Sequence, residues 1–211
     1  MNLSDIRLNY VKGNLDEQSI GDNPFEFFVQ WLDQALEAKV KEPTAMVLST
    51  VDESGSPRSR VVLLKEFKNG NLIFYSNYYS AKGRQMKSNQ QVAALFFWDE
   101  LERQVRINGS VSEISPEESD AYFNSRPLES RIGAVISPQS QVIGSREALE
   151  KDFEALLSRG DGHEIKRPEH WGGYAISIDE IEFWQGRPGR LHDRIRFLKE
   201  NGCWKKQRLA P

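Results

Sequence analysis

The chain has 211 residues, with 28 Lys and Arg against 31 Asp and Glu, so its formal net charge is −3. A chain of this length buries roughly 70% of the surface that its unfolded form exposes, which suits a single domain with a full core. With 38% hydrophobic and 10% aromatic residues, the composition excludes a disordered chain, and charges interrupt every apolar run before it is long enough to span a bilayer. We therefore expect a soluble globular protein that does not enter membranes.

Cysteine and histidine usage argues against a disulfide framework and against a metal centre. The single cysteine, Cys203, excludes an intramolecular disulfide, and residues 1–10 lack the basic and apolar segments of a signal peptide. A reducing cytoplasm is therefore the expected compartment. The histidines, His163, His170 and His192, lack the paired spacing of a zinc site, so we expect no metal.

Basic residues gather in two segments of an otherwise acidic chain. Residues 58–87 contain seven Lys or Arg and one Glu, and residues 184–211 contain eight Lys or Arg against two acids. Short basic segments on an acidic body suit small anionic ligands better than duplex nucleic acid, which usually meets a broad basic face. The same pattern is also compatible with solvated strand faces that bind nothing.

The first half of the chain changes from a helical to a strand pattern. Residues 1–22 are polar and weakly periodic, which predicts a partly ordered arm before a single domain at 23–211. Asn23 supplies a helix cap and Pro24 a first-turn proline, and the apolar spacing that follows predicts a helix ending before Pro43. Strands are then expected at 45–51, 59–67, 72–76, 91–98 and 102–114, with a short helix at 80–89.

The second half opens with a helix and closes with strands. Ser115, Pro116 and Glu118 form a capping-box pattern, and Pro127 must end or kink the helix that it opens. Ser145 is expected to cap a further helix that runs to about residue 158, before a loop at 159–170. Three late strands are expected at 173–183, 194–200 and 203–209.

This order of elements favours an α+β fold that is mainly β. Six or more short strands in hairpin order, with interposed helices, argue against a doubly wound sheet and favour an antiparallel barrel with peripheral helices. The sequence has no glycine-rich dinucleotide fingerprint after a strand and no P-loop. Any nucleotide-like cofactor must therefore be held by side chains and strand edges.

Two groups of residues have the composition of anion sites in the first half of the chain. The segment RVVLLK places Arg60 and Lys65 at the ends of an apolar strand, where their odd separation directs them to opposite faces of an undistorted strand. Tyr75 and Ser76 at a strand end, followed by Ser80 and Lys82 at a helix start, are the ingredients of a phosphate site. Charged strand ends in solvent and simple capping by Ser80 are the alternative readings.

Two further groups lie in the second half. Tyr122 and Arg126 share a helix face, and Ser130 follows, so the three together suit a second phosphate, although a cation packed on an aromatic ring explains the pair equally well. Downstream, Trp184 suits the border of a flat ring. In an extended chain the alternating side chains of Arg190, His192 and Arg194 would face one cleft, unless the histidine is purely structural.

These segments together resemble one family along nearly the whole chain. The sequence is similar to the pyridoxine 5′-phosphate oxidase (pyridoxamine 5′-phosphate oxidase) family in RVVLLK, YSN, ERQVRINGSV, YFNSRP, SPQSQ, WGGY, EFWQGRPGRLHDR and the terminal RLAP. The resemblance implies an FMN-binding split barrel of Greek-key type and a homodimer with FMN in clefts at the subunit interface. It also implies the last step of pyridoxal 5′-phosphate biosynthesis and salvage. In that step, O2 oxidises pyridoxine 5′-phosphate or pyridoxamine 5′-phosphate, with release of hydrogen peroxide and, from the amine, ammonia.

The resemblance also assigns residues by matching positions. It implies catalytic roles for Arg190 and His192, which would cover and polarise the pyridine ring. The FMN contacts that it implies are Arg60, Val61, Val62, Leu63, Leu64, Lys65, Tyr75, Ser76, Lys82, Gln104, Gln139, Ser140, Trp184 and Arg194. The substrate contacts that it implies are Lys65, Tyr122, Arg126, Ser130, Arg190 and His192, with Arg7 and Tyr10 of the arm closing over the substrate.

One position departs from the family pattern, and two other functions stay open. Where relatives commonly read Ser-Arg-Lys, this chain has Ala81 before Lys82, so we expect weaker FMN binding unless Arg84 compensates. The first alternative is a flavin reductase with a nicotinamide donor, which would not need Tyr122, Arg126 and Ser130. The second is a carrier that binds FMN or pyridoxal 5′-phosphate without turnover.

Overall fold

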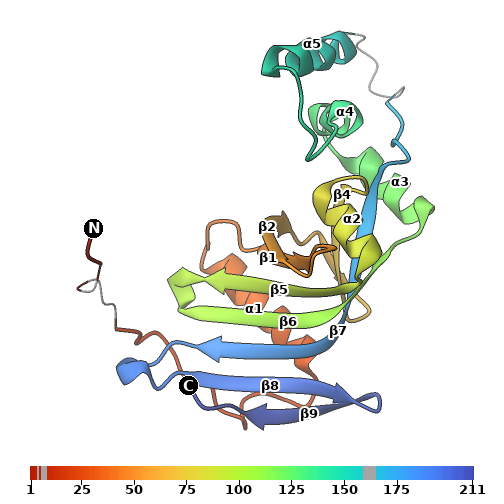
Figure 1. Cartoon of the computed structure of the whole chain (residues 1–211). Coiled ribbons are helices and arrows are strands. Elements are labelled where there is room, and N and C mark those ends of the chain that lie inside the picture. Colours follow the sequence, from red (N-terminus) through yellow and green to blue (C-terminus); the bar gives the residue numbers. More distant parts are fainter. Residues whose placement is uncertain (4, 6–8, 159–164) are drawn as a thin grey trace.

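The computed structural model describes residues 1–3, 5, 9–158 and 165–211 (Figure 1). In this part of the chain, nine strands form one antiparallel sheet that curls into a half-barrel, with five α-helices around it. The strands are β1 (Ala45–Val51), β2 (Pro57–Leu63), β3 (Glu66–Lys68), β4 (Asn71–Asn77), β5 (Gln91–Trp98), β6 (Arg103–Glu113), β7 (Trp171–Gln185), β8 (Asp193–Glu200) and β9 (Cys203–Arg208). The helices are α1 (Pro24–Glu37), α2 (Ala81–Ser88), α3 (Pro116–Ser125), α4 (Leu128–Ile136) and α5 (Arg146–Leu157).

The long strand β7 joins the two ends of the molecule. The sheet runs in the order β2-β1-β5-β6-β7-β4-β3, and the β8–β9 hairpin adds to β7 as well. The first half of β7 pairs with β4, from Trp171 opposite Asn77 onward, whereas its second half pairs with β8. The pairing of β6 with β7 shifts register next to Gly109, where a Cβ atom would lie 2.0 Å from the Ser177 carbonyl oxygen. Only glycine fits this bulge.

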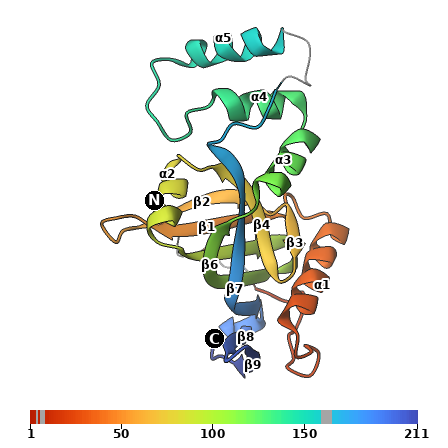
Figure 2. The ribbon, with the colours of Figure 1, turned by 90° about the vertical axis from the view of Figure 1, so that its right-hand side faces the viewer.

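Aromatic residues of α1 fill the hollow of the curled sheet. The Asn23 side chain caps the helix by accepting the Phe25 N–H at 3.0 Å, as expected from the sequence. The Phe28 ring meets Phe96 of β5 at 5.4 Å, and Phe27 meets Phe183 of β7 edge-on at 4.8 Å. Figure 2 shows α1 standing beside the sheet next to β3. Burial of these rings ties the helix to β5 and β7 of the sheet.

Helices α3, α4 and α5 gather at one end of the molecule, and the β8–β9 hairpin lies at the other (Figures 1 and 2). The Ser115 hydroxyl accepts the Glu118 N–H at 3.1 Å, which confirms the predicted cap of α3. Pro127 separates α3 from α4, as expected. None of the described helices combines the length and the apolar character needed to cross a membrane.

The expected strand at 59–67 is wrong in one respect, because the structure divides it. Strand β2 ends at Leu63 and β3 begins at Glu66. Between them, Leu64 N–H donates to the Thr44 carbonyl and Lys65 N–H to the Ile73 carbonyl, both at 2.8 Å. The chain therefore leaves the β1 side of the sheet and joins β4, which gives the half-barrel its corner.

Candidate active site

A cleft of about 730 Å³ opens between β2, β4, α2 and the helical end of the molecule. Thirteen of the residues that the sequence singled out line it: Arg60, Val61, Val62, Leu63, Lys65, Tyr75, Ser76, Lys82, Tyr122, Arg126, Ser130, Gln139 and Ser140. Leu64 is the exception within its segment, since it is only 4% exposed and belongs to the core. The break after β2 also brings Arg60 and Lys65 to the same cleft, so the expectation of opposite faces is wrong.

Arg60 is fixed at the wall of this cleft by neutral groups. Its guanidinium donates to the Leu48 carbonyl at 3.1 Å, to Thr50 Oγ1 at 2.7 Å and to Gln85 Oε1 at 3.0 Å. Burial lowers the pKa of Arg60, although an arginine keeps its charge in any protein environment. The side chain therefore brings a fixed positive charge that no carboxylate among these partners neutralises.

Lys82 stands in a ring of oxygen atoms at the start of α2. Its Nζ donates to Ser76 Oγ and Gln139 Oε1, both at 2.8 Å, and to Ser80 Oγ at 3.2 Å. Burial, reinforced by the charge of Arg60, lowers the pKa of Lys82 to about 8. Among the described residues that line the cleft there is no Asp or Glu. Two cations without a counter-ion make this end of the cleft an anion site.

A third cation, with an aromatic platform, lies on the other wall. Tyr75 stacks on Tyr122 with ring centroids 3.7 Å apart, and the Arg126 guanidinium lies 4.6 Å above the Trp171 ring. Arg126 Nη1 is buried without a hydrogen-bond partner among the described residues. Burial also raises the pKa of Tyr75 to about 12, so its phenol stays protonated at neutral pH. Because Ser130 lines the same wall, the group suits a second anion.

Five further predicted residues do not line this cleft but lie near the opposite end of β7: Gln104, Trp184, Arg190, His192 and Arg194. Gln104, Trp184 and Arg194 are register partners on β6, β7 and β8, so their side chains share one face of the sheet. Arg194 makes a two-pronged ion pair with Glu182, at 2.8 and 3.0 Å, which raises the pKa of Arg194 and holds the guanidinium beside Trp184.

Arg190 and His192 extend this second group, but not as an extended chain. Residues Pro188–Arg190 form a 3₁₀ turn, and Arg190 has a left-handed backbone with φ 62°. The expected alternation of three side chains is therefore wrong at Arg190, because the glycine-containing turn Arg187–Gly189 reverses the chain before β8 begins. Arg190 is exposed and His192 half-buried in this structure.

A backbone contact determines which nitrogen of a neutral His192 ring carries the proton. Its Nδ1 lies 3.1 Å from Arg187 N, whose N–H leaves Nδ1 the acceptor, so a neutral His192 carries its proton on Nε2. The ring lies 4.6 Å from Trp184 and 5.6 Å from Tyr10 of the arm. Tyr10 therefore contacts this group, and its closure over the substrate stays a prediction, whereas Arg7 lies outside the described residues.

Arg84 does not line the cleft at which the cation of position 81 is missing. Ala81 lines the cleft, but the Arg84 guanidinium donates to the Tyr79 carbonyl and faces a different cavity that includes Lys87. Ala81 and Arg84 both line a smaller neighbouring cavity beside Asp52, but only Ala81 also lines the cleft. Compensation by Arg84 stays a prediction, and it would require the guanidinium to leave the Tyr79 carbonyl.

Several residues that support the side chains of the cleft were not singled out by the sequence. Thr50 and Gln85 hold Arg60, and Trp171 supports Arg126. A signal existed for Thr50, because it follows Met46 and Leu48 in the buried positions of β1, where a polar side chain needs a partner. Gln85 follows Lys82 by three residues, a spacing that places both on neighbouring parts of one helix face.

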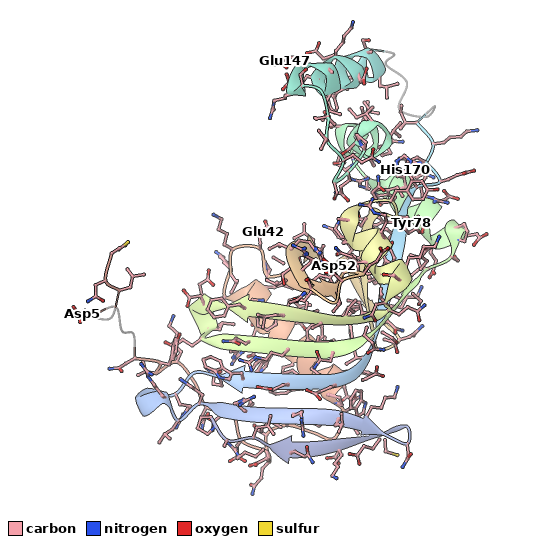
Figure 3. All side chains as sticks on the ribbon, viewed as in Figure 1. Asp5, Glu42, Asp52, Tyr78, Glu147 and His170 are labelled. Atoms are coloured by element: carbon pink, nitrogen blue, oxygen red, sulfur yellow. The ribbon has the colours of Figure 1, made fainter. Side chains whose placement is uncertain are left out.

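The histidines take separate places. His170 receives the Tyr78 N–H on its carbonyl at 2.7 Å and contacts the Ala134 carbonyl through Nε2 at 3.2 Å, and Figure 3 shows Tyr78 and His170 close together between α2 and α4. It is therefore part of the framework behind the cleft. His163 lies outside the described residues. Within residues that the structure describes, no three His, Cys, Asp or Glu side chains group as a metal site would require.

Comparison with known families matches the chain in two parts. A family model described as pyridoxamine 5′-phosphate oxidase matches residues 32–159. A second, described as the pyridoxine 5′-phosphate oxidase C-terminal dimerisation region, matches residues 171–211. The two segments together include both walls of the cleft and the second group around Trp184.

Curated relatives agree over the full length. Proteins named pyridoxine/pyridoxamine 5′-phosphate oxidase from Bacteroides thetaiotaomicron and Synechocystis are 50% and 48% identical to this chain, covering 100% of it and 99% of each relative. The relative of that name from Legionella pneumophila strain Paris is 51% identical over 99% of this chain and 97% of its own length.

Solved structures share the fold. PhzG from Burkholderia lata 383, crystallised with tetrahydrophenazine-1-carboxylic acid, superposes with a TM-score of 0.88 and 29% identity, covering 92% of this chain and 95% of that one. An FMN binding protein from Nostoc punctiforme PCC 73102, related to pyridoxamine 5′-phosphate oxidase, gives a TM-score of 0.75 at 16% identity, over 91% of this chain and 100% of its own. The half-barrel is therefore a split barrel, as expected.

Proposed function

The chain belongs to the pyridoxamine 5′-phosphate oxidase family of oxidoreductases, and from this premise we propose that it is an FMN-dependent oxidase of pyridoxine 5′-phosphate and pyridoxamine 5′-phosphate. The product is pyridoxal 5′-phosphate, O2 is the electron acceptor, and hydrogen peroxide is released. With the amine substrate, oxidation gives an imine, which water hydrolyses to the aldehyde with release of ammonia. The single observation that carries the proposal is one cleft with two separate cationic groups, around Lys82 and around Arg126. One suits the cofactor phosphate and the other the substrate phosphate.

The Lys82 end of the cleft fits the phosphate of FMN. Lys82 and Arg60 supply positive charge, and the hydroxyl of Ser76 adds a donor. Strand β2 is the edge strand of the sheet, and it pairs with β1 on one side only. On its free side, alternate residues therefore direct unpaired backbone N–H and C=O groups away from β1. Val61 to Leu63 of this edge line the cleft, which suits the hydrogen-bonding rim of a flavin ring. These residues fit FMN without a glycine-rich phosphate loop.

The Arg126 wall fits the phosphate of the substrate. The unpartnered Nη1 of Arg126 is a buried donor, and a buried donor without an acceptor costs about 1–3 kcal/mol, which a phosphate oxygen would relieve. The Tyr122 hydroxyl keeps its proton, because burial raises the pKa of Tyr122. Lys65 and Ser130 line the same cleft and complete a set of four donors.

One chain alone holds the two parts of the site far apart. Trp171 lines the cleft, and Trp184 lies thirteen residues later at the other end of the same strand, about 40 Å away at the usual rise of a strand. Figure 1 shows β7 running between these two ends. The match of residues 171–211 to a dimerisation region supports a homodimer in which Trp184, Arg190 and His192 of one subunit complete the cleft of the other.

The chemistry requires a redox group that the protein side chains do not provide. When bound, FMN would accept a hydride equivalent from the substrate carbon and pass the two electrons to O2, while the substrate oxygen or nitrogen loses a proton. Arg126, Tyr122 and Ser130 hold the substrate by its phosphate, which converts binding energy remote from the reacting carbon into orientation.

His192 and Arg190 act at the pyridine ring of the substrate. The contact between His192 Nδ1 and the Arg187 N–H keeps Nε2 as the donor, so His192 offers a hydrogen bond to an electronegative substituent. Arg190 adds an exposed cation on the turn beside it, which stabilises negative charge on the substrate oxygen. The ring of Trp184 lies against His192 and excludes water from that side.

The test is a spectrum followed by turnover. We expect the purified protein to be yellow, to bleach when pyridoxine 5′-phosphate is added without air, and to release one peroxide per pyridoxal 5′-phosphate when air returns. A protein that stays yellow with the substrate but bleaches with NADH or NADPH is instead a reductase. A protein that binds substrate without bleaching or peroxide is a carrier. We expect this reaction in the cytoplasm, where the exposed thiol of Cys203 stays reduced.

A further inference from the structure

The N-terminal arm is fastened to the second half of the site by one carboxylate. Glu102 Oε2 accepts the backbone N–H groups of Val11 and Lys12, at 2.8 and 2.9 Å. These residues are about ninety positions apart in the sequence, so the contact belongs to the tertiary fold. Hydrogen bonds to a charged acceptor are roughly twice as strong as neutral ones. The ionised Glu102 therefore supplies a strong anchor for this part of the arm.

Glu102 is buried and has an unusual backbone conformation. The residue is only 7% exposed, and its backbone is left-handed at φ 54° and ψ 42°, a conformation that a glutamate rarely adopts. Its own carbonyl accepts the Gly186 N–H at 2.8 Å, so the residue also ties the start of β6 to the end of β7. One residue therefore joins the arm, β6 and the segment that leads to His192.

The anchor sets the place of Tyr10, which directly precedes Val11. The Tyr10 ring packs edge-on against Trp184 at 5.7 Å and against His192 at 5.6 Å. Gly186 makes room for it, because a Cβ atom there would lie 2.7 Å from the Tyr10 Cβ. The Glu102 Cβ lies on the other side of the same gap, at 3.1 Å from that position. The position of Tyr10 is therefore defined by Trp184, His192 and Gly186, and Glu102 borders the same space.

We propose that Glu102 is a positioning residue of the reaction, which holds the arm so that Tyr10 covers His192 and Trp184. The effect of Glu102 on turnover rests on the proposed function. The contact between Glu102 and the arm does not depend on that function. If the arm is loosened, only a fraction of molecules presents the closed site, and the apparent substrate affinity falls by that fraction. Once substrate is bound in a closed site, the reaction proceeds as before. The expected signature is a raised KM with little change in kcat.

The anchor is tested on the FMN-loaded full-length protein by hydrogen exchange. In Glu102→Gln, which keeps the size but removes the charge, the amides of Val11 and Lys12 should exchange at least about tenfold faster. Glu102→Asn tolerates the left-handed backbone and is too short to reach the arm, so it should do the same. The matched control is Glu100→Gln, whose side chain meets Lys41 N and not the arm, and it should leave both amides unchanged. Unchanged exchange in both Glu102 variants overturns the anchor.

The effect on the reaction is tested by a double-variant cycle with Tyr10→Ala. Glu102→Gln alone should raise KM for pyridoxine 5′-phosphate at least about fivefold, with kcat within about twofold and flavin content unchanged. In the Tyr10→Ala background the same change should alter KM by less than about twofold, because the two residues act through one contact. The positioning role is overturned if Glu102→Gln raises KM equally in both backgrounds. It is also overturned if the amides of Val11 and Lys12 exchange faster while KM does not rise. A wild-type protein that does not oxidise the substrate refutes the proposed function and this role, while exchange still decides the anchor.

Discussion

The Nζ of Lys82 donates to Oε1 of Gln139 at 2.8 Å across the cleft, although 57 residues separate the two in the sequence. Ser76 Oγ lies within 3.3 Å of the same Gln139 oxygen. Uncharged oxygen atoms therefore solvate an ammonium group that burial and Arg60 disfavour. This environment makes the charge of Lys82 sensitive to pH near the physiological range.

FMN binding should weaken as pH rises above 8. In the free protein the pKa of Lys82 is about 8, below the ordinary lysine value of 10.5, because of burial first and of Arg60 second. A bound phosphate raises the pKa again, since an opposite charge favours the ammonium. Binding therefore takes up a proton above pH 8. The FMN phosphate itself is fully ionised there, with a second pKa of about 6.

The measurement is FMN affinity by fluorescence quenching at several pH values. The Kd should be about tenfold weaker at pH 9 than at pH 7, and the binding enthalpy measured by calorimetry at pH 9 should depend on the ionisation enthalpy of the buffer, which reports proton uptake. Lys82→Arg stays charged over this range and should change by less than about twofold. A wild-type Kd that is flat from pH 7 to 9 would contradict the assignment of Lys82 to the phosphate. In Lys82→Ala, the primary effect should be a loss of bound FMN.

Replacement of Arg126 by Met should impair recognition of the substrate phosphate and spare the flavin. Arg126 Nη1 has no acceptor among the described residues. The hydrogen bond that the replacement removes is therefore the one to the substrate phosphate. A charge-assisted hydrogen bond contributes about 1.5–3 kcal/mol, which corresponds to a roughly 10-fold to 160-fold lower kcat/KM for pyridoxine 5′-phosphate. Steady-state kinetics with flavin quantified in each sample provide the measurement. Pyridoxine without phosphate, as a poor substrate, should lose less than about threefold.

Much of the fold followed from patterns within the chain, and the errors arose where tertiary contacts replaced them. The strand at 45–51 and the caps at Asn23 and Ser115 agree with the structure, because alternation and capping are local properties. The break after Leu63 depends on carbonyl groups of Thr44 and Ile73, which no local pattern reveals. Periodicity therefore predicted the elements, but not the corner that brings Arg60 and Lys65 together.

The site shows the same division. The residue types at Ser76, Lys82 and Arg126 indicated phosphate binding, since charge and hydroxyls are visible in the sequence. Their distances, and the partners of Arg60, depend on the sheet and were not predictable. The turn at Arg190 was missed because alternation was assumed through a segment with two glycines and a proline.

Replacement of Arg190 by Met should reduce catalysis without loss of the cofactor. Arg190 sits on an exposed turn at the end of β7, away from the cleft that its own chain forms. We therefore expect kcat/KM for pyridoxine 5′-phosphate to fall at least about tenfold, with FMN near one per subunit. Unchanged turnover would remove Arg190 from the reaction. Arg187→Met is a less suitable control, because Arg187 also binds the arm through the Gly13 carbonyl.

A heterodimer of two defective chains should recover activity if the site lies between subunits. Lys82→Ala damages the cleft and Arg190→Met damages the other group, so each homodimer has two impaired sites. In a dimer with one chain of each kind, one site combines the Lys82→Ala cleft with the Arg190→Met group and has both defects. The other site combines the intact cleft of one chain with the intact group of the other and has neither defect. Chains with different tags, expressed together and purified through both tags, should therefore show about half of the wild-type kcat per dimer. The control pairs Lys82→Ala with Lys82→Ala under the two tags. Activity as low as this control in the mixed dimer would mean that each chain carries its own complete site.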